Sequence, residues 1–107
     1  MKLYFGGVPV GEVYDYDAIS INSSAAKTLT AAKLMPAGHS PCRGAMITIE
    51  SGSARVRLDG GTPTTTSGHL VAPGDAIGIS GINNLRNFRA SWAVGSANVS
   101  LRVSYMR

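Results

Sequence analysis

The sequence predicts an all-β fold, an antiparallel β-sandwich of Ig-like or jelly-roll-like topology built from short strands with Gly/Pro turns. First, apolar and polar residues alternate in several short segments, which is the period of a half-buried strand. Second, the 107-residue chain has 13 glycines and 5 prolines, which mark turns between these segments. Third, the chain has no heptad or internal repeat. A chain of this length is expected to fold as a single domain, residues 1–107.

Residues 1–16 leave two alternatives open. The segment is rich in tyrosine and acidic residues, and Gly6, Gly7 and Pro9 interrupt any long strand in it. It is either an extended N-terminal arm that packs on a neighbouring subunit or the first strand and loop of the same domain. The arm alternative predicts that the segment is poorly ordered in an isolated monomer.

Residues 17–35 are expected to form two short strands, at 18–21 and 28–30, around a polar turn. The threonines on either side of Leu29 favour the second strand. The alternative is a short helix over residues 25–34, where alanine and lysine favour helix formation.

A firmer β pattern begins at Ala45. Ala45, Ile47 and Ile49 occupy alternate positions and therefore share one face of a strand. Residues 51–53 are expected to turn this strand into a hairpin with residues 55–59.

The segment 55–69 is expected to carry a rigid, shape-defining loop. In its strand Val56 and Leu58 share one face, and the charged residues around them share the other. The turn that follows is dense in Gly, Pro and Thr, and its threonine hydroxyls can satisfy backbone groups. The residues expected to define this turn are Asp59, Gly60, Pro63, Thr64 and Gly68.

Beyond this loop the β pattern continues to the C-terminus. Pro73 before Gly74 suits a type II turn, and residues 76–79 are expected to form a short strand. Residues 82–85 are expected to form a polar-capped turn that tucks Leu85 inward. Two more strands follow, with inward-facing residues Phe88, Ala90 and Trp92, and then Val99, Leu101, Val103 and Tyr105. Arg89 and Ser91 are expected to face outward.

Charge and cysteine content narrow the classes of partner. The formal net charge is +4, but the ten Lys and Arg residues are dispersed along the chain. This pattern, without a basic and aromatic platform, argues against nucleic acid as the main partner. Cys42 is the single cysteine, which rules out an intrachain disulfide and fits folding in a reducing cell. Neither a transmembrane helix nor a signal peptide is expected, because no apolar run is long enough.

No catalytic, cofactor or metal site is expected. His39, Cys42 and His69 are the candidate metal ligands, but zinc needs four ligands, or three with an open position, at workable spacing. No signature of a cysteine nucleophile surrounds Cys42, and no Gly-x-Ser-x-Gly elbow, phosphate loop or dinucleotide fingerprint is present. The chain is therefore expected not to be an enzyme.

Part of the chain resembles a family of small proteins of tailed bacteriophages. The resemblance covers residues 36–107 and begins with an Ala-x-Ile strand at residues 45–47. The motif Arg-x-Arg-x-Asp-Gly-x-x-Pro-Thr follows at residues 55–64. A strand similar to Leu-x-x-Phe-Arg at residues 85–89 and a final Val-x-Tyr strand at residues 103–105 complete the pattern.

This resemblance implies a non-enzymatic virion structural protein, in the first place a capsid decoration or cement protein that stabilises the head. Such a protein would act as a homo-oligomer, contact the major capsid protein or other virion proteins, and reside in the virion after assembly in the host cytoplasm. The alternative is a neck, tail or fibre-associated module that binds a host glycan or receptor. No membrane partner, nucleic-acid partner or cofactor is implied.

A small set of side chains forms the candidate partner-facing surface: Arg55, Arg57, Arg89, Arg102 and Tyr14. The arginines either meet acidic patches of a capsid or only solubilise the sheet, since exposed ion pairs contribute little stability. A glycan would need exposed aromatic rings. Tyr4, Tyr14 and Tyr16 are the candidates for that role, whereas Trp92 is expected in the core.

Overall fold

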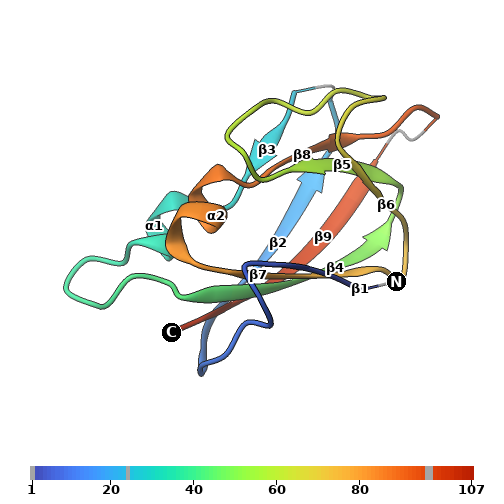
Figure 1. The fold of residues 1–107 in the computed structure, drawn as a ribbon. Coiled ribbons are helices and arrows are strands. Elements are labelled where there is room, and N and C mark those ends of the chain that lie inside the picture. Colours follow the sequence, from blue (N-terminus) through green and yellow to red (C-terminus); the bar gives the residue numbers. More distant parts are fainter. Residues whose placement is uncertain (1, 24, 96–97) are drawn as a thin grey trace.

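Strands dominate the computed structural model, which describes residues 2–23, 25–95 and 98–107. The strands are β1 (Lys2–Phe5), β2 (Val13–Ile21), β3 (Lys27–Thr28), β4 (Gly44–Ser51), β5 (Ala54–Arg57), β6 (His69–Val71), β7 (Ala76–Ser80), β8 (Arg89–Trp92) and β9 (Val99–Met106) (Figure 1). Two short helices, α1 (Ala31–Leu34) and α2 (Ile82–Asn87), complete the elements of the described residues. The all-β class predicted from the sequence is therefore confirmed.

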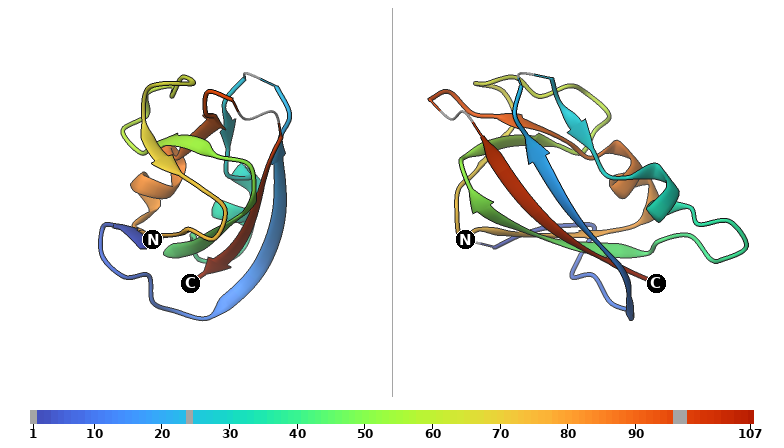
Figure 2. Two further views of the ribbon diagram at one scale, coloured as in Figure 1. Left: turned by 90° about the vertical axis from the view of Figure 1, so that its right-hand side faces the viewer. Right: turned by 180° about the vertical axis from the view of Figure 1, so that it is seen from behind.

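The strands form two sheets with a nested pattern of pairing. The five-stranded sheet has the order β1-β7-β4-β9-β2, and the four-stranded sheet has the order β3-β8-β5-β6. Four of the pairs are antiparallel, namely β2–β9, β3–β8, β4–β7 and β5–β6. Along the sequence, each of these pairs encloses the next. β2 and β9, from opposite ends of the chain, consequently lie side by side (Figure 2).

One hydrophobic core lies between the sheets. Alternate residues of each strand point into it, as the period of two requires. The largest side chains that are fully buried there are Tyr105, Phe88, Ile21, Ile47, Ile77, Ile79, Leu85 and Leu101. Leu34 of α1 and Leu85 of α2 join the same cluster, so the two helices belong to this core. The Cα radius of gyration of 12.8 Å is close to the roughly 13 Å of a compact 100-residue domain.

The N-terminal segment packs on its own chain. β1 pairs in parallel with β7, and the buried Pro9 lies on the outer face of the five-stranded sheet. Two glycines make room for this segment. A Cβ at Gly44 would lie 2.7 Å from Pro9 Cβ, and a Cβ at Gly78 would lie 2.6 Å from Tyr4 Cδ1. Within one chain, residues 2–5 thus have the geometry of a first strand. Met1, the start of the arm alternative, lies outside the described residues.

The predicted hairpin between residues 45–50 and 55–59 is wrong. β4 pairs with β7 and β9, whereas β5 pairs with β6 and β8 in the other sheet. Both edges of β4 are already paired, one with β7 and one with β9, so β5 has no free edge beside it. Gly52 lies at the crossing, where its φ of +71° suits glycine and a Cβ would collide with the carbonyl oxygen of Asn98. The chain therefore passes from one layer to the other at Gly52 instead of folding back beside itself.

Other elements differ from their predicted bounds. The strand expected at residues 18–21 is the longer β2, and residues 27–34 contain both a short strand and a helical turn. Residues 82–87 form helix α2 where a turn was expected, although Leu85 is buried as predicted. No helix among the described residues has the length and apolar character needed to cross a membrane.

Candidate functional site

The loop between β5 and β6 folds back over the outer face of the four-stranded sheet. Ser91 on β8 donates from its hydroxyl to the Thr64 carbonyl oxygen at 3.4 Å, and Val94 N–H donates to Thr65 O at 3.0 Å. Pro63 is buried beneath this fold-back. Ser91 faces outward as predicted, but the loop covers it and leaves it 1% exposed.

Hydrogen bonds within the loop fix its shape. The Thr64 hydroxyl accepts from the N–H groups of Thr66 and Ser67 at 3.4 and 3.0 Å, and Thr64 N–H donates to Ser67 O at 3.1 Å. Gly60 and Gly68 have φ values of +86° and +121°, which suit glycine. The five residues expected to define the turn lie in this loop.

Arg57 and Asp59 form a two-bond ion pair at the start of the loop. Arg57 Nε donates to Asp59 Oδ1 at 3.0 Å, and Arg57 Nη2 donates to Asp59 Oδ2 at 2.5 Å. The hydrogen bond from Arg57, together with one from Gly61 N–H, lowers the pKa of Asp59 to about 2. The pair therefore remains ionised across the physiological pH range.

Two more arginines lie beside this pair and hold the loop. Arg89 lies directly opposite Arg57 in the register of β5 and β8. Arg89 Nη1 donates to the Thr62 hydroxyl at 3.5 Å, and Arg55 Nη1 donates to Gly68 O at 3.1 Å. The Nε atoms of Arg55 and Arg89 are buried and have no hydrogen-bond partner among the described residues. We call Arg55, Arg57 and Arg89, with the loop above them, the arginine face.

The other two predicted partner-facing residues lie elsewhere. Arg102 is on β9 of the five-stranded sheet, where it pairs with Thr48 and Ala18 of the neighbouring strands. The Tyr14 ring stacks against the Arg107 guanidinium, with Arg107 Cζ 4.2 Å from the ring centroid. Burial raises the pKa of Tyr14 well above its usual value. The structure thus brings three of the five candidates together and separates two.

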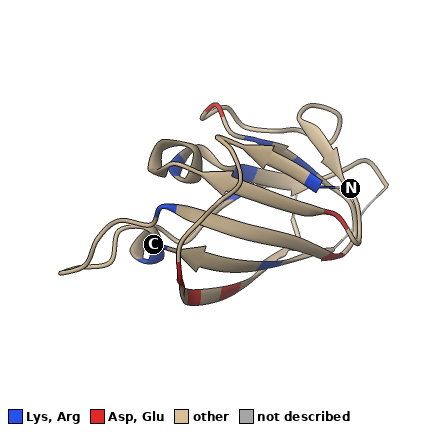
Figure 3. Cartoon of the chain, turned by 60° about the horizontal axis from the view of Figure 1, so that its bottom comes forward, with Lys and Arg blue, Asp and Glu red and all other residues tan. Residues whose placement is uncertain are grey.

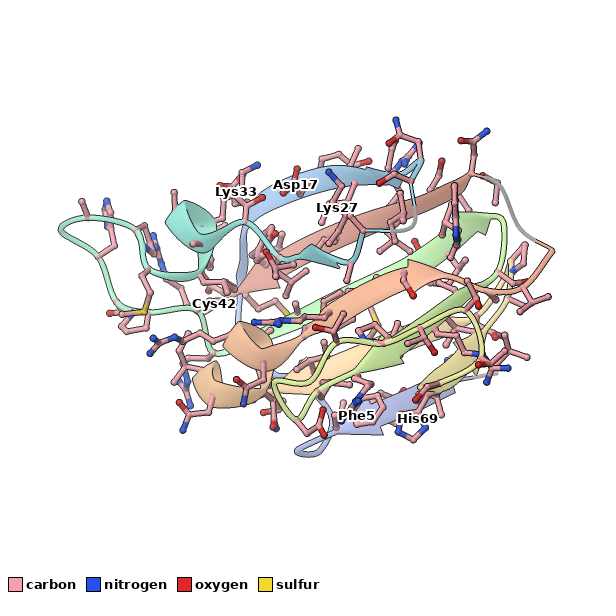
Figure 4. The ribbon with its side chains drawn as sticks, turned by 90° about the horizontal axis from the view of Figure 1, so that it is seen from above. Phe5, Asp17, Lys27, Lys33, Cys42 and His69 are labelled. Carbon is pink, nitrogen blue, oxygen red and sulfur yellow. The ribbon has the colours of Figure 1, made fainter. Side chains whose placement is uncertain are left out.

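One long side of the molecule is closed by polar contacts between β2 and the segment around α1 (Figure 4). The Tyr14 hydroxyl donates to Lys33 O at 2.5 Å, and Lys33 Nζ donates to Tyr16 O at 2.6 Å. Asp17 Oδ2 accepts from the Thr30 hydroxyl at 2.5 Å and from the Tyr105 hydroxyl at 3.3 Å. We call this the closed side.

The opposite long side contains a cavity. Phe5 on β1 and His69 on β6 lie together there in Figure 4, with ring centroids 5.5 Å apart and planes tilted by 56°. They bridge the edge strands of the two sheets. A cavity of about 460 Å³, the side pocket, lies beside them and is also lined by Arg57, Asp59 and Ser67. We call this the open side.

Sequence reasoning did not identify the side pocket. The sequence pattern places Phe5 in the interrupted segment 1–16 and offers His69 as a candidate metal ligand, and neither feature indicates a pocket. The period-two spacing of Arg57 and Asp59 was the one local signal, since it places both side chains on one face. The approach of Phe5 depends on the parallel pairing of β1 with β7, which no local pattern encodes.

The predicted metal candidates do not converge. Cys42 is buried, and its Sγ donates to Gly44 O at 3.1 Å and to Met106 O at 3.3 Å. His69 lies on the open side, away from Cys42 (Figure 4). Within residues 2–23, 25–95 and 98–107, no group of three His, Cys, Asp or Glu side chains could hold a metal ion.

Comparisons with protein-family models, curated proteins and solved structures found no match to this chain.

Proposed function

We propose that the protein is a non-enzymatic structural protein of a bacteriophage virion that decorates and cements the capsid as a homo-oligomer. Support comes from the resemblance of residues 36–107 to small phage proteins and from the arginine face. The partner is the major capsid protein, or another virion protein, carrying acidic side chains. The protein resides in the virion, and its part is to present a fixed shape and charge to a neighbour.

We assign the two sheets to the jelly-roll type of sandwich rather than to the Ig-like type. The four nested antiparallel pairs, from β2–β9 inward to β5–β6, favour this assignment. Jelly rolls place eight strands in two sheets and recur in viral capsid and lectin domains. In this assignment β1 is an additional edge strand, paired in parallel with β7.

The arginine face is the observation that carries the proposal. Three guanidinium groups lie on one face of the four-stranded sheet, and Asp59 is the one carboxylate hydrogen-bonded to them among the described residues. The excess positive charge favours an acidic partner surface and opposes a basic one. Because the loop above is fixed by its own hydrogen bonds, little conformational entropy is lost when a partner binds.

Acidic side chains lie mainly at other places on the molecule. Asp15 and Asp17 belong to β2, at the edge of the five-stranded sheet, and red segments mark this edge in Figure 3. Lys33 Nζ lies 3.5 Å from Asp15 Oδ1 and 3.9 Å from Asp17 Oδ1, so the lysine neutralises part of the negative charge of this pair. On the arginine face, by contrast, three guanidinium groups share one hydrogen-bonded carboxylate, that of Asp59, among the described residues. Weak individual contacts of this kind gain strength when many copies bind one lattice.

The test is binding to empty expanded capsids of a phage that encodes the chain. Wild-type protein is expected to bind and to raise the temperature at which the capsids rupture. The double variant Arg55→Gln and Arg89→Gln is expected to bind at least about tenfold more weakly, because two charge-assisted contacts are lost. Arg102→Gln, on the other sheet, is the matched control and is expected to bind like wild type.

Two results would contradict the proposal. One is a capsid whose rupture temperature is the same with and without the protein. The other is copy number: a dozen or fewer copies per purified virion would favour the neck, tail or fibre alternative, whereas hundreds support decoration of the head shell.

A further inference from the structure

We propose that the side pocket is a binding site for a neutral saccharide. This inference is independent of capsid decoration, and it gives the alternative function, a glycan-binding module, a defined location. The lining residues come from three separate segments: the end of β1, the end of β5 with the residues that follow it, and the start of β6. The volume of about 460 Å³ falls in the range of roughly 300–1,000 Å³ that is typical of small-ligand sites.

The two oppositely charged side chains that line the pocket, Arg57 and Asp59, favour a neutral ligand. Arg55 and Arg89 of the arginine face are not among the lining residues. Arg57 and Asp59 are already joined by two hydrogen bonds, so their charges largely cancel. An anion that approaches Arg57 is repelled by the adjacent carboxylate, and a cation that approaches Asp59 is repelled by the guanidinium. Neither ion gains net attraction from the pair, and the lowered pKa of Asp59 keeps the carboxylate ionised at neutral pH.

The hydrogen-bonding capacity of the pair favours a polyhydroxyl ligand. A guanidinium carries five N–H groups and a carboxylate about four acceptor positions. The ion pair occupies two of each, and Gly61 N–H occupies a third acceptor position of Asp59. The remaining donors and acceptors lie side by side. Vicinal hydroxyl groups each donate and accept, so a diol can bind both members of the pair at once. Ser67 and His69 add further polar groups around the pocket.

The apolar part of the pocket completes the match to a sugar ring. Phe5 and Leu58 contribute an aromatic ring and an aliphatic side chain to the lining. A pyranose has one face rich in C–H groups, which packs on aromatic and aliphatic surfaces, while its hydroxyls point to the rim. A small polar ion gains little from contact with this apolar surface. The juxtaposition of a cancelled ion pair with an apolar wall therefore points to the saccharide class.

The test is a titration of the ¹⁵N-labelled full chain with the methyl pyranosides of glucose, galactose and mannose, and with inorganic phosphate as the anionic probe. We expect at least one glycoside to shift the backbone amides of Ser67, Gly68 and His69, with a dissociation constant on the order of 1 mM for a ligand of this size. Phosphate is expected to bind more weakly than that glycoside.

Two pocket variants and one control sharpen the test. Asp59→Asn keeps the shape of the side chain but removes its charge, so it is expected to weaken glycoside binding about tenfold and to strengthen phosphate binding. His69→Gln, at an exposed position, is a second variant that is expected to weaken glycoside binding without disturbing the core. Asp15→Asn on the closed side is the matched control, with a change below about twofold.

Several outcomes would overturn the inference. Amides of the pocket that do not shift with any of the glycosides at tens of millimolar would do so. Tighter binding of phosphate than of every glycoside would reassign the pocket to anions. Equal glycoside affinity in Asp59→Asn, His69→Gln and Asp15→Asn would place the binding elsewhere. Capsid binding is measured separately, so the failure of one proposal is distinguishable from the failure of the other.

Discussion

The two long sides of the molecule, the closed side and the open side, are held together by different kinds of contact (Figure 4). On the closed side, Tyr14, Lys33 and Asp17 take part in hydrogen bonds of 2.5–2.6 Å that join β2 to the segment around α1. On the open side, the ring contact between Phe5 and His69 bridges the sheets and leaves the side pocket beside it. The polar contacts of the closed side form a seam between β2 and the segment around α1, whereas the open side retains space for a ligand.

Connection length explains the difference. The chain between β2 and β4 contains β3, α1 and a loop, so it has enough residues to cover the closed side. Between β6 and β7 there is only the tight turn at residues 72–75, in which Asp75 N–H donates to Ala72 O at 2.9 Å. Nothing in that turn can cover the open side. β1 lies there instead, and it adds a single edge strand without filling the gap.

The largest expected effect comes from removing the aromatic ring at the centre of the seam. Tyr105 is fully buried, so Tyr105→Ala is expected to lower the free energy of unfolding by about 3–5 kcal/mol. Phe5→Ala on the open side is expected to cost less than about 2 kcal/mol, because that ring is only half-buried. Urea denaturation of both variants measures the difference. Equal losses in the free energy of unfolding would show that the two sides contribute equally to stability.

The next effect concerns how β1 is held on the open side. Gly78→Ala places a Cβ 2.6 Å from Tyr4 Cδ1 and 2.9 Å from Pro9 Cδ, and is expected to cost about 1–3 kcal/mol. The displaced segment should also expose the β1 amides to faster hydrogen exchange. Ser104→Ala on the same sheet is the control and should stay within about 0.5 kcal/mol of wild type. If the glycine variant matched this control, the packing of Tyr4 and Pro9 would not hold β1 in place.

A smaller effect is expected for one hydrogen bond of the closed side. Thr30→Val removes the hydroxyl that donates to Asp17 Oδ2, and should cost about 0.5–1.5 kcal/mol. Thr66→Val, on the exposed loop, makes the same chemical change and should cost less than about 0.5 kcal/mol. Thermal unfolding of the pair gives the comparison. A larger loss at Thr66 than at Thr30 would contradict the assignment of the seam.

The closed side should be sensitive to alkali. Burial raises the pKa of Tyr105 from 10.0 to about 12, and burial also raises the pKa of Tyr14. A raised pKa means that the folded state keeps its proton after the unfolded chain has lost it. The contribution to stability is therefore complete below pH 10 and is lost as pH rises from 10 to about 12. Unfolding free energies of wild type and Tyr14→Phe across this window test it, with the variant expected to fall less steeply.

The open side should show a weak dependence on acid. The pKa of Asp59 is lowered from 3.8 to about 2, chiefly by the hydrogen bond from Arg57. A lowered pKa contributes stability above pH 3.8 that is lost as pH falls toward 2. Because the pair is exposed to solvent, the effect should be small. The difference between wild type and Asp59→Asn, measured by urea denaturation across that window, isolates it. A difference that does not change with pH would contradict the pairing.

Local sequence patterns predicted much of the framework. Period-two alternation identified the buried faces of the strands that contain Ile47, Val56 and Leu101. Turn chemistry identified the loop of residues 59–68, where the hydroxyl of Thr64 bonds to backbone groups as expected. Such features depend on residues that are close in sequence, so the sequence alone is enough to infer them.

Long-range contacts could not be inferred in this way. The crossing from β4 to β5 depends on the pairing of β4 with β7 and β9, which belong to distant segments. The seam joins Tyr105 to Asp17, and the open side joins Phe5 to His69. Alternation shows which residues face inward, but it does not show which strand lies opposite. Only part of the candidate site could therefore be predicted. Arg55 and Arg57 alternate on one strand, which local sequence reveals, whereas Phe5 and His69 come from separate strands.

Amide hydrogen exchange of the free protein tests most directly the claim that one side is a seam and the other is open. The amides of β9, and the β2 amides that donate hydrogen bonds to it, should exchange only through global unfolding, whereas those of β1 and β6 should exchange at least about tenfold faster through local opening. That difference is the predicted result. Equal protection of the four strands, or slower exchange in β1 and β6 than in β2 and β9, would contradict the account.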